Sequence, residues 1–104
     1  MIEWTDDNTN LLDVLTAHYL GEELNPECCS KSDIHFYMHK FDTCSPRGSA
    51  WVWCSNCKKY VHADGFTANT KNCDGINVSL LCAVPDYLES IKSRIDEHNR
   101  LNRP

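Results

Sequence analysis

The stretch 51–65 constrains the fold of this 104-residue chain more than any other part of it. It reads Trp-Val-Trp-Cys-Ser-Asn-Cys-Lys-Lys-Tyr-Val-His-Ala-Asp-Gly, so a Cys-x-x-Cys pair separates two runs of residues that favour β-strands. We expect one strand over 50–54 and another over 58–62, which turns back on the first and ends before Gly65. Because side chains alternate along a strand, Val52 should face one side of the sheet and the two tryptophans the other.

Further helices and strands are expected around this unit. Leu11 and Leu15 recur at helical spacing after a start rich in Asp, Asn and Thr, and Gly21 is a natural stop, which predicts a helix over 8–20. A strand is expected over 34–41 because this run is dense in β-formers and aromatic residues. Alternation along it would place Ile34, Phe36 and Met38 on one face and His35, Tyr37, His39 and Phe41 on the other.

The end of the chain predicts two more elements. Residues 76–82 alternate apolar and polar side chains, which predicts a fourth strand. Pro85 suits the first turn of a helix over 86–100, because its missing amide hydrogen costs nothing there. Three residues mark the buried face of this helix: Leu88, Ile91 and Ile95. The expected fold is a single α+β domain over 1–104, with an N-terminal helix, a three- to four-stranded antiparallel sheet and a C-terminal helix.

Composition indicates the class of protein. A charged fraction of 24% and a hydrophobic fraction of 41% are ordinary for a globular domain, and no apolar stretch approaches the roughly 20 residues of a membrane span. Acidic residues stand near the N-terminus where a signal peptide would carry basic ones. The seven cysteines are an odd number, which favours free thiols in a reducing compartment. We therefore expect a cytoplasmic protein that does not associate with a membrane.

The negative charge is concentrated in the first third of the chain. Residues 1–33 hold eight acidic side chains and one basic side chain, so their balance of −7 exceeds the −5 of the whole chain. A field of this sign repels phosphate backbones and attracts basic proteins. The charge pattern therefore argues against direct binding of nucleic acid and favours a basic protein partner, although acids also serve solubility and helix N-termini.

The Cys-x-x-Cys pair has three interpretations in terms of chemistry. Zinc would need four thiolate or imidazole ligands, and the candidates are Cys54, Cys57, Cys28 and His62. No second Cys-x-x-Cys pair supplies the other two ligands, because Cys28 and Cys29 are adjacent. In addition, Lys58 replaces the glycine common after a zinc knuckle. A redox pair should precede a helix, but the residues after Cys57 resemble a strand. A cysteine nucleophile would need an oriented histidine, and chance pairings are easy among so many cysteines and histidines.

The pattern Trp-x-Trp-Cys-x-x-Cys-x-x-x-x-His-x-x-Gly over 51–65 resembles a segment of small bacterial immunity proteins. Those proteins neutralise the toxins of contact-dependent growth inhibition and other polymorphic toxin systems. The resemblance covers about 15 of the 104 residues. It implies a cytosolic, non-enzymatic protein that binds one toxin domain tightly. We expect no cofactor, with zinc at the Cys-x-x-Cys pair as the alternative.

Charge and resemblance lead to one hypothesis. An acidic surface would steer a basic nuclease toxin toward this chain, and exposed aromatic side chains would anchor it. The proposed contact residues are Asp6, Asp7, Asp13, Glu22, Glu23, Glu27, Tyr19 and Tyr37. The alternative is a small zinc-binding module with a regulatory or nucleic-acid-associated role, built on Cys54 and Cys57.

Overall fold

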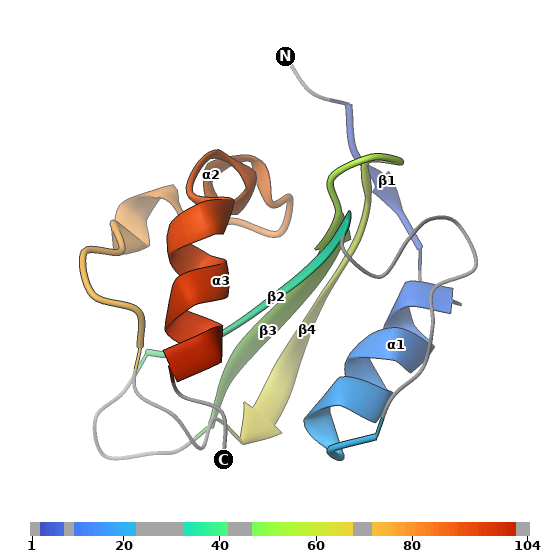
Figure 1. The fold of residues 1–104 in the computed structure, drawn as a ribbon, viewed down its shortest axis with the longest axis horizontal. Helices are drawn as coiled ribbons and strands as arrows, with labels where there is room; N and C mark the ends of the chain where they lie inside the picture. Colours follow the sequence, from blue (N-terminus) through green and yellow to red (C-terminus); the bar gives the residue numbers. More distant parts are fainter. Residues whose placement is uncertain (1–2, 8–9, 23–32, 42–46, 68–71, 102–104) are drawn as a thin grey trace.

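Three layers make up the fold: a four-stranded sheet lies between helix α1 on one face and helices α2 and α3 on the other (Figure 1). This arrangement comes from a computed structural model. The structure describes residues 3–7, 10–22, 33–41, 47–67 and 72–101. The α+β class expected from the sequence is confirmed, with helices before and after the sheet.

The sheet has the strand order β1-β4-β3-β2. Its strands are β1 Thr5–Asp6, β2 Ile34–Lys40, β3 Arg47–Cys54 and β4 Lys59–Thr67. The pairs β2–β3 and β3–β4 are antiparallel, as predicted. However, β1 pairs with β4 in parallel, so the sheet is mixed and the expectation of a purely antiparallel sheet was wrong. A two-residue strand has too little periodicity to be recognised from sequence.

Strand β4 is longer than predicted. It continues through Asp64 and Gly65 to Thr67, because β3 begins at Arg47 and so offers pairing partners as far as Thr67. Gly48 pairs with Phe66 and Ser49 pairs with Asp64, which leaves Gly65 without a counterpart. This irregularity is a β-bulge, and it bends the far end of the hairpin.

Alternation of side chains divides the core into two clusters, one on each face of the sheet. On the α1 face, aliphatic side chains of α1 pack against Val52, Cys54 and Val61. On the α2–α3 face, Trp51 and Trp53 pack with a set of side chains from the strands, the loop before α2 and both helices: Tyr37, Tyr60, Cys73, Leu88 and Ile95. The predicted faces of the strands over 34–41 and 50–54 are confirmed for the residues in these clusters.

The helices differ from the predictions in detail. Helix α1 spans Asn10–Tyr19, inside the predicted range 8–20, whose first two residues lie outside the described part. The C-terminal helix is interrupted at Ile91 and forms α2 Asp86–Ser90 and α3 Lys92–Leu101. Its predicted buried face is confirmed at Leu88 and Ile95.

The expected strand over 76–82 was wrong. Val78–Leu80 forms a turn of 3-10 helix, and Asn77 caps it by accepting a hydrogen bond from the Ser79 backbone N–H at 3.2 Å. A side chain that bonds its own neighbouring backbone competes with strand pairing. The alternating pattern therefore did not lead to a strand, and Val78 and Leu80 are exposed.

Candidate functional site

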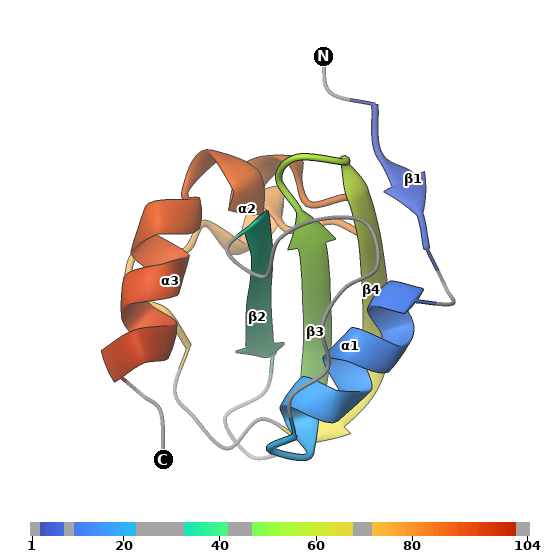
Figure 2. The same cartoon turned by 45° about the vertical axis from the view of Figure 1, so that its right-hand side comes forward.

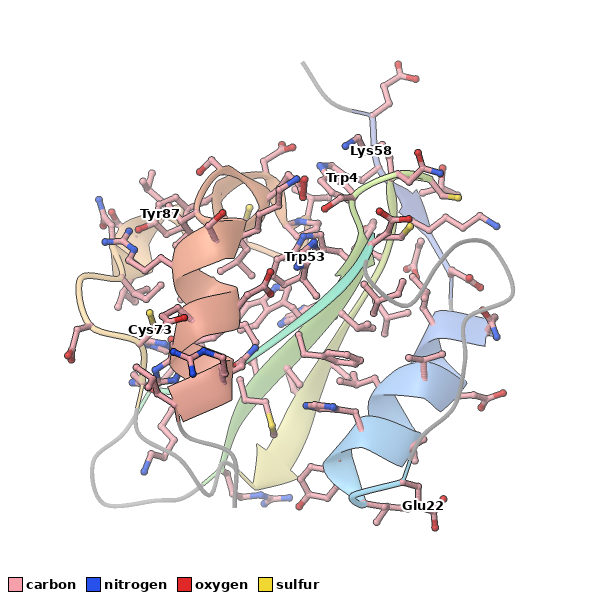
Figure 3. All side chains as sticks on the ribbon, viewed as in Figure 1. Trp4, Glu22, Trp53, Lys58, Cys73 and Tyr87 are labelled. Atoms are coloured by element: carbon pink, nitrogen blue, oxygen red, sulfur yellow. The ribbon has the colours of Figure 1, made fainter. Side chains whose placement is uncertain are left out.

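The acidic residues proposed for partner binding lie around α1 and β1, where the structure describes them. Asp6 is exposed on β1, and Asp13 and Glu22 are exposed on α1 and just after its end. In Figure 3, Glu22 lies at the far end of α1 from Trp4, so the acidic residues extend along this layer. Glu23 and Glu27 lie outside the described residues.

Asp7 has a structural role in addition to its charge. Its carboxylate accepts a hydrogen bond from the Asn10 backbone N–H at 3.2 Å and so satisfies one of the unpaired amides at the start of α1. It is half-buried, whereas Asp6, its neighbour in sequence, is exposed. Among the described acids, Asp6, Asp13 and Glu22 are therefore better placed than Asp7 to meet a partner.

Only one of the two expected aromatic anchors is accessible. Tyr19 is 37% exposed at the end of α1, beside Leu20, which is 63% exposed. Tyr37 is 1% exposed, so its assignment as an exposed anchor was wrong. It lies between the sheet and the α2–α3 layer, stacked on Trp51, because odd-numbered side chains of β2 point to that face.

The Cys-x-x-Cys pair forms the tight turn between β3 and β4. The Cys57 backbone N–H donates a hydrogen bond to Cys54 Sγ at 3.3 Å, and the Lys58 N–H donates to the Cys54 carbonyl at 3.0 Å. Lys58 has a φ of 58°, the left-handed conformation that a glycine would adopt without strain. A strand follows this turn, which matches the expectation that the context is unlike that of a redox pair.

The proposed zinc ligands do not all converge. Cys54 is buried on the α1 face, whereas His62 stacks on Trp51 on the opposite face, with ring centroids 4.8 Å apart. The sheet therefore separates His62 from Cys54, and the assignment of His62 as a co-ligand was wrong. Cys28 lies outside the described residues. Within the described part of the chain, no group of three or more His, Cys, Asp or Glu residues could hold a metal ion.

A buried carboxylate that the sequence did not reveal joins this turn to the helices. The Glu89 side chain is 10% exposed on α2. It accepts hydrogen bonds from Trp53 Nε1 at 3.1 Å, Ser55 Oγ at 2.8 Å and Lys92 Nζ at 3.0 Å. Lys58 Nζ lies 4.0 Å away and also donates to the Ser55 carbonyl. The spacing of Glu89 and Lys92 on one helix was the available signal, and nothing local indicates Trp53 or Ser55.

The environment of Glu89 keeps it ionised. Burial by itself would raise the pKa of this carboxyl, but the hydrogen bonds from Lys92, Ser55 and Trp53 favour the charged form and lower the pKa. A carboxylate that is ionised and fully bonded is a poor proton acceptor. The arrangement therefore acts as a clamp between β3, the turn and α2, rather than as an acid–base centre.

A second polar cluster lies at the far end of β2. The Asn72 carboxamide accepts from the Lys40 backbone N–H and donates to the Lys40 carbonyl, both at 2.8 Å. The hydroxyl of Tyr37 lies 2.7 Å from His39 Nδ1 and accepts from the Cys73 N–H at 3.3 Å. Burial lowers the pKa of His39 and raises the pKa values of Tyr37 and Cys73, so all three side chains stay neutral at physiological pH.

This cluster borders an open pocket of about 380 Å³. Its lining residues include His39, Phe41, Asn72, Cys73, Ile76 and Val78. Because the Cys73 thiol has a raised pKa and its Sγ donates to the Asp74 carbonyl at 3.7 Å, it is not activated as a nucleophile. Cys73 therefore supplies no activated nucleophile to this surface hollow.

Comparison with known protein families, with curated proteins and with solved structures finds no match to this chain. No helix within the described ranges has the length and apolar character needed to cross a bilayer.

Proposed function

We propose that this chain is an immunity protein that binds and neutralises a basic bacterial toxin domain through the acidic α1–β1 layer. By this name we mean the exposed surface of α1 and of the edge strand β1, with Asp6, Asp13 and Glu22. The observation that carries the proposal is the exposure of Asp6, Asp13 and Glu22 around α1, together with Tyr19 and Leu20. Acidic side chains around a small apolar patch suit a partner that is steered by charge and anchored by buried contacts.

The opposite layer offers fewer free charges. On α2 and α3, Glu89 pairs with Lys92, Asp96 pairs with His35, and Glu97 pairs with Arg100. Toxin domains that cut nucleic acids are themselves basic, because their substrates are anionic. Binding through the α1–β1 layer would cover such a basic surface and exclude the substrate, and this mechanism needs no chemistry from the immunity protein.

The proposal is tested with the C-terminal domain of the protein encoded immediately upstream, since an immunity gene normally follows its toxin gene. Co-expression of this chain should restore growth, and the two purified proteins should associate at a rate that falls as salt is raised. The double variant Asp13→Lys/Glu22→Lys should slow association about ten-fold at low salt.

A matched control changes the net charge equally on other parts of the molecule. Asp74→Lys/Glu97→Lys reverses two exposed acids, one in the loop before α2 and one on α3. It should slow association much less than the α1 pair. Equal effects of the two double variants would show that net charge alone matters, and absence of both binding and growth rescue would overturn the proposal.

One observation favours a second function, that of a zinc-binding module with a regulatory or nucleic-acid-associated role. The Cys57 N–H donates a hydrogen bond to Cys54 Sγ, which holds the two cysteines of the pair at one turn, as two ligands of a single metal ion would need to be. Cys54 and Cys57 supply half of a tetrahedral ligand set. Metal analysis of the purified chain should then find one zinc per molecule that is lost in Cys54→Ser and retained in Cys82→Ser, and a metal-free protein would rule this function out.

A further inference from the structure

The outward-facing backbone groups of β2 and of β4 differ in how many of them have hydrogen-bond partners. Along β2, the Asn72 carboxamide occupies both the N–H and the C=O of Lys40, and Asn99 Nδ2 donates to the Phe36 carbonyl at 2.6 Å. Side chains from the loop before α2 and from α3 thus take the place of a neighbouring strand. These bonds cover this edge at Phe36 and at Lys40.

Along β4, backbone pairing stops partway. The Thr5 N–H donates to the Lys58 carbonyl and the Asp7 N–H donates to the Tyr60 carbonyl, both at 2.9 Å. Strand β1 then ends, because Asp7 turns to cap α1. Figure 2 shows β1 alongside only the end of β4 that is nearer to the β3–β4 turn.

The direction of the remaining groups follows from strand geometry. Alternate residues of a strand direct their N–H and C=O groups to the same edge, so His62 and Asp64 present theirs on the side where Tyr60 meets Asp7. Among the described residues, no backbone partner on that side is found for either one. The bulge at Gly65 bends the strand and ends this regular stretch, which is therefore short.

The charges beside the open edge are acidic. The Asp64 side chain is 78% exposed; one of its oxygens accepts a hydrogen bond from Ser49 Oγ at 2.5 Å and lies 3.5 Å from His62 Nε2. Asp6 is exposed on the adjoining strand. Helix α1 packs against β3 and β4, so the open edge adjoins the acidic α1–β1 layer (Figure 2). A residue placed directly across from Asp64 on an added strand would be favoured if it were basic and opposed if it were acidic.

We propose that a short extended segment of the toxin adds to the open edge of β4 as a further strand, with a basic side chain opposite Asp64. This inference rests on the proposed function and names the way in which that surface holds its partner. Backbone bonds to His62 and Asp64 would fix the register of the toxin, and the acids around α1 would meet its basic surface.

Amide hydrogen exchange on the complex tests the proposal with the unmodified protein. The probe is the same upstream-encoded toxin domain, added to isotopically labelled chain. The His62 and Asp64 amides should exchange at least about ten-fold more slowly in the complex, because a new hydrogen bond protects each of them. The Lys40 amide, already bonded to Asn72, is the internal control and should change little.

Two substitutions at one position separate backbone from side chain. Asp64→Thr removes the carboxylate but keeps the N–H, whereas Asp64→Pro removes both. The N–H of Asp64 points away from β3, so proline there breaks no β3–β4 bond and is of the kind tolerated on edge strands. If strand addition occurs, Asp64→Pro should bind the toxin about ten-fold more weakly than Asp64→Thr, with both variants folded by circular dichroism.

The outcomes distinguish this proposal from the function on which it rests. If the toxin binds but the His62 and Asp64 amides stay unprotected and the two variants bind alike, strand addition is wrong and the immunity function stands. If no binding occurs, both are overturned. A concentration-dependent dimer of the free chain that Asp64→Pro abolishes would place a second copy on this edge and also overturn the proposal.

Discussion

The two faces of the sheet are packed by different chemistry. On the α1 face, Leu11, Leu15 and Val14 meet Val52 and Val61, and the contacts are apolar throughout the described cluster. On the other face, Trp53 Nε1 donates to Glu89, and Trp51 Nε1 donates to the Cys82 carbonyl at 3.0 Å. In the described part of the chain, no buried side-chain N or O atom lacks a hydrogen-bond partner.

This difference has consequences for what each layer can do. Aliphatic contacts are non-directional, and the packing of α1 uses only the apolar side chains of its inner face. The acidic side chains on its outer surface are therefore available to a partner. Directed hydrogen bonds set the positions of α2, α3 and the β3–β4 turn. The charged side chains that form these bonds are therefore already paired within the protein. Stability that depends on charge should therefore reside on the α2–α3 face.

The largest expected effect is at Trp53. Trp53→Ala should lower the free energy of unfolding by about 3–5 kcal/mol, because it empties a fully buried site and removes a donor from Glu89. Denaturant unfolding followed by circular dichroism measures this change. Trp53→Phe should cost less, since most of the ring is kept. A smaller loss for Trp53→Ala than for Leu15→Ala would contradict the comparison.

Leu15 tests the aliphatic face. Leu15→Ala should lower the free energy of unfolding by about 2–4 kcal/mol through lost burial and a residual cavity. The loss should change little between pH 7 and pH 4, because the described residues of this cluster include no carboxylate and its nearest imidazole, that of His18, only stacks on Phe36 at the margin. Chemical unfolding at both pH values checks it, and a strongly pH-dependent loss would mean that the α1 face also relies on charge.

Glu89 tests the α2–α3 face, which is held by directed hydrogen bonds. Glu89→Gln should lower the free energy of unfolding at pH 7 by about 1–3 kcal/mol, because it weakens the bonds from Trp53, Ser55 and Lys92. The folded pKa of Glu89 is lowered, so its stabilisation is present above the unfolded value of about 4.3 and is lost as pH falls through the folded value.

The pH dependence supplies the control for that variant. The difference between wild type and Glu89→Gln should shrink between pH 5 and pH 2, as protonation removes the charge that the clamp favours. Thermal unfolding at several pH values measures it. A difference that stays constant over this range would show that Glu89 contributes by shape alone.

His39 should show the smallest effect. Burial lowers its pKa in the fold, so the unfolded chain binds a proton near pH 6.5 while the folded chain does not. This contribution to stability is complete above about pH 6.5 and declines as pH falls toward the folded pKa. Wild type should lose more stability than His39→Gln between pH 7 and pH 5 in thermal unfolding, and parallel curves would contradict this.

Much of the fold followed from patterns within single segments. Alternation placed Trp51 and Trp53 opposite Val52, and helical spacing placed Leu88 and Ile95 inside. The same rule failed at 76–82, where Asn77 bonds its own neighbours and a 3-10 turn replaces the strand. Periodicity describes how side chains repeat, but not whether another strand is available to pair.

The candidate site was less predictable. Exposure of Asp6, Asp13 and Glu22 agrees with the acidic pattern, whereas Tyr37 is buried despite its polar tip. Tyr37 could not be assigned from its own segment, because its hydroxyl is satisfied by His39 and Cys73. Likewise, the distance of His62 from Cys54 depends on which face each one takes in the assembled sheet.

The sequence by itself determined the α+β class, the acidic first third and the turn made by Cys54 and Cys57, because each depends on residues close together in the chain. Only the tertiary structure decided the parallel pairing of β1, the clamp at Glu89 and the contrast, within the described residues, between a partly covered and an open sheet edge. Those features depend on which distant segments meet. Backbone hydrogen bonds and buried polar contacts leave no local pattern until packing brings their partners together.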